Sequence, residues 1–157
     1  MDVTNIDLTY ILDGHGWSSC YLIIDNEQHL FGPTHILNNP LEELVNAENI
    51  LIGDSSDVSF KWFDEPGLYQ WDIVRDLNEK HLISISINTY AEWEPSTKPE
   101  QQLKFKCKLS EFLFCLYYQL VKLDKLLTDK SFSKYRACDF PRQAYKKFKS
   151  SFELKYS

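Results

Sequence analysis

Two neighbouring carboxylates, Asp64 and Glu65, are the side chains of this sequence best placed for acid–base chemistry. Aromatic residues flank them on both sides, as in enzyme clefts that cleave sugars, where two carboxyl groups hold different pKa values. The same residues open the run DEPG, and Pro and Gly are residues that a tight turn needs. Adjacent side chains in such a turn point in different directions. We therefore expect a turn here, and a hydrolase that pairs these carboxylates with a nearby histidine stays an alternative.

No cofactor or metal motif accompanies the carboxylates. The histidines have neither the i, i+4 spacing of helical zinc sites nor the Cys and His spacing of zinc fingers. The glycines form neither G-x-G-x-x-G nor a Walker sequence. We predict no catalytic residues, no cofactor and no metal. The histidines considered are His15, His29, His35 and His81.

The charge of the chain is divided unevenly along the sequence. Residues 1–99 carry 17 acidic and 4 basic side chains, a net charge of −13, whereas residues 100–157 carry 6 acidic and 13 basic ones, a net charge of +7. Two halves that neutralise each other, a basic region for an acidic partner, or an acidic surface for a basic partner would each explain this division. The acidic residues that we select as a partner-binding surface are Asp54, Asp57, Asp64 and Glu65.

Lysines and aromatic residues alternate in the C-terminal part and form a candidate basic patch. Such a combination can bind the backbone of nucleic acids and stack on their bases. The sequence pI of about 5.2 opposes that function, and lysines beside the apolar stripe of a helix are usually its solvated face. Nucleic-acid binding is therefore kept only as an alternative. The patch comprises Lys104, Lys106, Lys108, Lys146, Lys147 and Lys149.

Length and composition favour one globular domain. The chain has 157 residues, of which 43% are hydrophobic and 25% charged, so we expect a single α+β domain over 1–157 with a basic helical segment at about 129–157. No apolar run reaches the roughly 18 residues that span a membrane, and the first residues resemble no signal peptide, so a cytoplasmic location is expected. Widely spaced cysteines without a C-x-x-C pair predict reduced thiols. The cysteines are Cys20, Cys107, Cys115 and Cys138.

Alternating apolar and polar residues predict strands that carry these candidates. The alternation occurs in short runs before residue 32 and again between residues 58 and 109. Between the two sets, Asn39 can cap a helix that has Pro40 at its first position and ends near Asn49. Residues 91–102 are rich in Glu, Pro, Ser and Thr, which predicts an exposed loop.

Two further helices are predicted in the C-terminal part. Ser110 is a plausible cap for the first, and the second starts at Pro141. The resulting order is β-β-β-α-β-β-β-β-α-α, with links of hairpin length between most strands. This order favours an α+β fold in which an antiparallel β-sheet of about six to seven strands has one face covered by two to three helices.

The pair Gly16-Trp17, the helix start at Pro40 and Leu41, and the run DEPGLYQWD resemble a group of small uncharacterised bacterial proteins. In that group a GW strand is followed by a PLxxL helix and a DEPGxYxW hairpin. The resemblance covers roughly residues 7–127. Some members look like immunity proteins that neutralise a cognate toxin, which implies a non-enzymatic protein whose partner is another protein. We therefore expect protein binding, with an immunity-like inhibitor of a basic toxin as its specific form.

Overall fold

The computed structural model describes residues 2–94 and 98–157 and confirms the predicted α+β class. Seven strands pair in antiparallel order, as predicted, but they form two sheets instead of one. The first three strands make a sheet with the order β1-β2-β3, and the other four make a sheet with the order β4-β5-β6-β7. The helix between β3 and β4 separates the two sets along the chain. Of the predicted loop 91–102, residues 95–97 lie outside the described residues.

The three-stranded sheet is a meander of short hairpins. Its alternating pattern leaves one face buried and one accessible, as expected when one side of a sheet carries the core. His15 adopts a positive φ of 57° in the first turn, and Asp25 one of 54° in the second. The strands are β1 (Ile6–Gly14), β2 (Trp17–Ile24) and β3 (Glu27–Phe31).

The four-stranded sheet confirms the predicted hairpins. The run DEPG forms the turn between its first two strands, and a Cβ atom on Gly67 would collide with the backbone oxygen of Tyr90. Glycine is required there by this close approach of two backbones. The strands are β4 (Asp57–Phe63), β5 (Leu68–Arg75), β6 (Leu82–Tyr90) and β7 (Gln101–Lys108).

Aromatic side chains join the two sheets in the core. Phe31 of β3 packs edge-on against Tyr69 at 5.2 Å between ring centroids and tilted against Trp71 at 6.3 Å. Single bridges connect the sheets at two further places, one of which pairs Val3 with Lys106. The other places Thr34 against both Trp17 and Phe63, and those bridges fix the loop that leads into the first helix.

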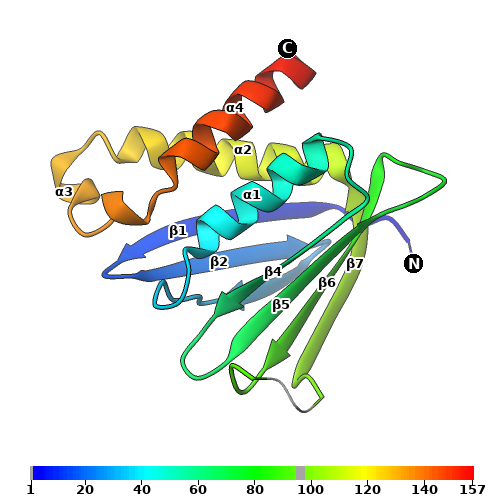
Figure 1. Cartoon of the computed structure of the whole chain (residues 1–157), viewed down its shortest axis with the longest axis horizontal. Helices are drawn as coiled ribbons and strands as arrows, with labels where there is room; N and C mark the ends of the chain where they lie inside the picture. The colour runs from blue at the N-terminus through cyan, green and yellow to red at the C-terminus, as the bar shows by residue number, and fades with distance from the viewer. Residues whose placement is uncertain (1, 95–97) are drawn as a thin grey trace.

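The helices gather on one side of the sheets (Figure 1). The helix at residues 40–52 packs against β4, and the helix at residues 109–126 packs against β1 and β7. The helix at residues 142–156 packs against both of these helices. No helix among the described residues is long and apolar enough to cross a membrane. The helices are α1 (Pro40–Ile52), α2 (Leu109–Leu126), the short α3 (Lys130–Ser133) and η1 (Ala137–Asp139), and α4 (Arg142–Tyr156).

The predicted helix starts are confirmed for α1 and wrong for α2. Asn39 caps α1 by accepting a hydrogen bond from the N–H of Glu42 at 3.1 Å, and the helix runs beyond Asn49 to Ile52. In contrast, Ser110 does not cap α2. That helix begins at Leu109, directly after β7, and the residue at its cap position, Lys108, makes no side-chain capping hydrogen bond. All four cysteines are free thiols, as predicted.

Candidate functional site

The structure separates the acidic residues that the sequence groups together. Asp54 follows α1 and lies 3.7 Å from the guanidinium of Arg75, and Asp57 begins β4. Asp64 and Glu65 follow the opposite end of that strand. A strand rises about 3.3 Å per residue, so Asp57 and Asp64 are about 23 Å apart. The predicted acidic surface is therefore two separate sites.

The candidate basic patch is divided as well. Lys104, Lys106 and Lys108 alternate with the buried residues of β7 and so lie on the outer face of the four-stranded sheet. Lys106 also lies 3.2 Å from Asp76, in a partly buried ion pair. The remaining lysines, Lys146, Lys147 and Lys149, belong to α4 in the helical layer.

Asp64 has a structural role in the β4–β5 turn. Its carboxylate accepts hydrogen bonds from the N–H of Glu65 at 2.7 Å and from the hydroxyl of Tyr69 at 3.1 Å. Burial, together with this carboxylate, raises the pKa of Tyr69 to about 12. No histidine among the described residues is hydrogen-bonded or ion-paired to Asp64 or Glu65, so the contacts of the alternative carboxylate–histidine hydrolase are not present in this part of the chain.

Glu65 instead belongs to an open cavity between two hairpin ends. The cavity has a volume of about 630 Å³ and lies between the β4–β5 turn and the segment after β6. Both segments lie at the end of the four-stranded sheet that is far from the helices (Figure 1). We call this cavity the acidic pocket. It is lined by Glu65, Pro66, Glu92, Trp93 and Glu94.

The indole of Trp93 is fixed within the acidic pocket. Its Nε1 donates a hydrogen bond to the backbone oxygen of Asp64 at 2.6 Å, and its ring packs edge-on against Phe63 at 6.0 Å. The side chain is nevertheless 37% exposed. A fixed aromatic ring beside three carboxylates suits a lysine or arginine side chain, which the ring attracts through its face and the carboxylates attract by charge.

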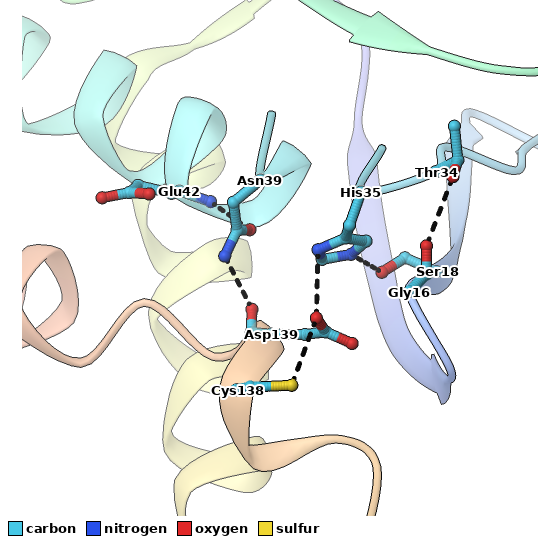
Figure 2. A network of polar contacts seen from close by, with 8 residues as sticks. All are labelled: Gly16, Ser18, Thr34, His35, Asn39, Glu42, Cys138 and Asp139. Atoms are coloured by element: carbon cyan, nitrogen blue, oxygen red, sulfur yellow. Dashed lines mark hydrogen bonds and ion pairs between the residues drawn. The ribbon is translucent and has the colours of Figure 1, made fainter. Parts of the chain in front are cut away.

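A second arrangement brings together a serine, a histidine and an aspartate. The Oγ of Ser18 lies 2.9 Å from Nε2 of His35, and Nδ1 of the same ring lies 3.4 Å from the carboxylate of Asp139. Figure 2 shows the imidazole between its two partners, which come from β2 and η1. The order of contacts is that of nucleophile, base and orienting acid in serine hydrolases.

This serine–histidine–aspartate network is closed to solvent. Ser18 is 2% exposed, and its backbone N–H donates to the carbonyl of Pro33. Burial lowers the pKa of His35, and the neighbouring carboxylate of Asp139 opposes this shift. Asn39 adds a further contact, because its amide donates to the backbone oxygen of Asp139 at 3.0 Å (Figure 2). The network therefore ties the C-terminal segment to β2 and to the start of α1.

Within residues 2–94 and 98–157 no group of three His, Cys, Asp or Glu side chains is arranged to hold a metal ion.

Comparison with known proteins adds no assignment. A scan against protein-family models, a search of curated proteins and a search of solved structures each find no match to this chain.

Sequence reasoning missed residues in both sites. Glu92 and Glu94 lie in a segment interpreted only as an exposed loop, although a tryptophan between two glutamates was a usable signal. His35 and Asp139 are 104 positions apart, and no local pattern joins them. Only the packing of η1 against the N-terminal sheet brings them together.

Proposed function

We propose that this chain is a non-enzymatic binding protein that holds a basic protein partner at the acidic pocket. The observation that carries the proposal is the open cavity that Glu65, Glu92 and Glu94 line together with the fixed ring of Trp93. A lysine or arginine of the partner would gain ionic hydrogen bonds and a cation–π contact there. The resemblance to immunity-like proteins supports an inhibitor of a toxin with a basic surface as the specific form.

The pattern of ion pairs supports this reading of the divided charge. Among the described residues, the ion pairs that join the acidic and basic parts of the chain are Lys106 with Asp76 and His35 with Asp139. Arg75 and Arg142 pair with carboxylates of their own part. Few acidic side chains are thus neutralised by the basic segment, and no ion pair within the described residues engages the glutamates of the acidic pocket.

The test compares two variants of equal charge. Glu65→Gln, Glu92→Gln and Glu94→Gln together remove three charges from the acidic pocket, while Glu42→Gln, Asp57→Asn and Glu79→Gln remove three elsewhere. Proteins captured from the native lysate at low salt are identified, and each is purified and titrated against both variants. We expect the partner's affinity to fall about tenfold or more for the pocket variant only, with association that slows as salt rises. Equal binding by both variants would reject the pocket as the binding site.

A hydrolase is the second candidate, because Ser18, His35 and Asp139 make the contacts of a catalytic triad. The burial of Ser18 opposes it, since no substrate reaches a hydroxyl that is 2% exposed. Turnover of p-nitrophenyl acetate by the purified chain and by Ser18→Ala distinguishes the two functions. Turnover that is lost in the variant would establish the hydrolase, and equal background rates would reject it.

A further inference from the structure

In the part of the chain that the structure describes, the edge of β3 and most of the edge of β7 lack a neighbouring strand, and residues of both strands line the same cleft. β3 pairs only with β2, and no hydrogen bond among the described residues joins the backbone of Glu27–Phe31 to any other element. β7 pairs with β6, and its other side is met by the N-terminal segment only at Lys106. Residues 101–105 of β7 are therefore free on that side. Each free edge is five residues long.

The cleft between these edges has a volume of about 500 Å³. Four consecutive residues of β3 and three of β7 line it, and consecutive side chains of a strand point to opposite faces. Ile87 and Thr89 of β6 line it as well, and they share one face of the four-stranded sheet with their cross-strand partners Leu103 and Gln101. The cleft therefore lies between the edge of β3 and the inner face of β6 and β7. We call it the edge cleft. Its lining consists of Gln28, His29, Leu30, Phe31, Ile87, Thr89, Gln101, Gln102 and Leu103.

The edge of β1 is covered by side chains from α2. The backbone N–H of Ile6 donates to the carboxylate of Glu111 at 3.1 Å. The backbone N–H of Tyr10 donates to the side-chain oxygen of Gln119 at 3.3 Å. A sheet edge that is satisfied in this way cannot accept a further strand.

The edge of β4 is covered by the loop before α1. Asn38 donates its amide to the carbonyl of Lys61 at 2.9 Å, and the N–H of Thr34 donates to the carbonyl of Phe63 at 2.7 Å. Within the described residues, the edges of β3 and of residues 101–105 of β7 are therefore not covered by side chains or loops in this way. Unpaired backbone groups on an edge form a template for another extended chain.

We propose that the edge cleft binds an extended, uncharged segment of a partner protein, which pairs as an added strand with β3 while β6 and β7 form the opposite wall. Among the described residues that line the cleft there is no carboxylate or ammonium, so charged side chains of the segment would gain no partner there. On the inner side Phe31, Ile87 and Leu103 offer apolar contacts, and on the outer side Gln28 and Gln102 offer amides. The segment therefore alternates apolar and polar residues over about five positions. This site is separate from the acidic pocket and does not rest on the proposed function.

The probe is an acetylated and amidated heptapeptide of alternating valine and threonine. We expect it to bind, as measured by the anisotropy of a fluorescent label, and to slow amide hydrogen exchange in Glu27–Phe31 but not in β1. Two further peptides carry N-methyl groups on all valines or on all threonines. Because a strand turns alternate N–H groups to one neighbour, at least one of them loses binding. Equal binding by all three peptides, or unchanged exchange in β3, would overturn the proposal.

Variants of the chain test the position of the site. Leu30→Lys places a charge on the cleft wall at a residue that is already 59% exposed, and Gln102→Lys does so on the opposite wall. Ile36→Lys, at a residue that is 58% exposed outside the cleft, is the matched control. We expect both cleft variants to bind the heptapeptide about tenfold more weakly and the control to bind it unchanged. Wild-type binding by both cleft variants contradicts the proposal.

The oligomeric state is a separate test. A dimer that forms through β3 and excludes the peptide, seen by light scattering, would identify a second copy as the occupant and overturn the proposal as well.

Discussion

Glu48 is a carboxyl group whose surroundings oppose its charge. It is fully buried in α1, and neither oxygen of its carboxyl group has a hydrogen-bond partner among the described residues. Burial raises its pKa well above the ordinary value of 4.5. The folded state therefore holds the proton more tightly than the unfolded chain does. The contribution of Glu48 to stability is greatest while both states are protonated, and it is lost as the pH rises from about 4.5 toward the folded-state pKa.

Replacing Glu48 should stabilise the protein at neutral pH. Glu48→Leu removes a buried polar group without a partner, so we expect the free energy of unfolding at about pH 7 to rise by about 1–3 kcal/mol. Glu48→Gln removes the titration and should flatten this part of the pH dependence. Urea unfolding at several pH values measures both effects, with Glu42→Gln as an exposed control in the same helix. A Glu48→Leu protein less stable than the wild type would contradict this account.

The pKa of His35 should report on the serine–histidine–aspartate network. The effect of His35 on stability has the opposite pH dependence to that of Glu48. Burial lowers its pKa below 6.5, so the unfolded chain binds the proton more readily. The contribution of His35 to stability is present above about pH 6.5 and is lost as the pH falls toward the folded-state pKa. Asp139→Asn removes the carboxylate that favours the imidazolium and should lower this pKa further. A two-dimensional NMR titration of the ring measures it, and an unchanged or higher value in the variant would count against the ion pair.

At the scale of elements, the segment between α2 and α4 clamps the β1–β2 turn. The guanidinium of Arg136 donates to the carbonyls of Leu12 at 2.8 Å and Phe132 at 3.1 Å. Beside it, the ring of Tyr135 stacks on His15 with 4.3 Å between centroids. Contacts from a segment more than 100 residues away thus hold the first hairpin in place.

Arg136→Ala should loosen this clamp. Hydrogen bonds from a charged group to buried carbonyls are lost, so we expect the free energy of unfolding to fall by about 1–3 kcal/mol and amide exchange in residues 13–17 to accelerate. Arg142→Ala is the control, because its ion pair with Asp124 is exposed, and it should cost less than about 1 kcal/mol. Similar losses in the two variants, measured by chemical denaturation, would argue against a special role for Arg136.

At the scale of the whole molecule, the two charge segments do not form two surfaces. The acidic residues of the N-terminal part separate to opposite ends of β4, and the lysines of the C-terminal part separate to β7 and α4. Net charge along the sequence therefore does not give the charge of a face. The acidic pocket gathers its carboxylates from two hairpin ends that meet at one end of the sheet.

The sequence by itself determined the order of the seven strands and of the three long helices, whereas the short α3 and η1 were not predicted. Alternation over Ile83, Ile85 and Ile87 was sufficient to predict a strand with one buried face, and Asn39 with Pro40 was sufficient to start a helix. These features depend on neighbours a few positions apart, because the periods of strand and helix are local. The cap predicted at Ser110 failed, since β7 leads straight into α2.

Only the tertiary structure decided the sites. The network joins His35 to Asp139, the acidic pocket joins Glu65 to Trp93, and the edge cleft joins β3 to β7. Each of these contacts links segments that are distant in sequence, and it forms only because the two sheets and the helical layer bury a common core. Local patterns carry no information on which faces and edges meet, since that choice is made by packing of the whole chain.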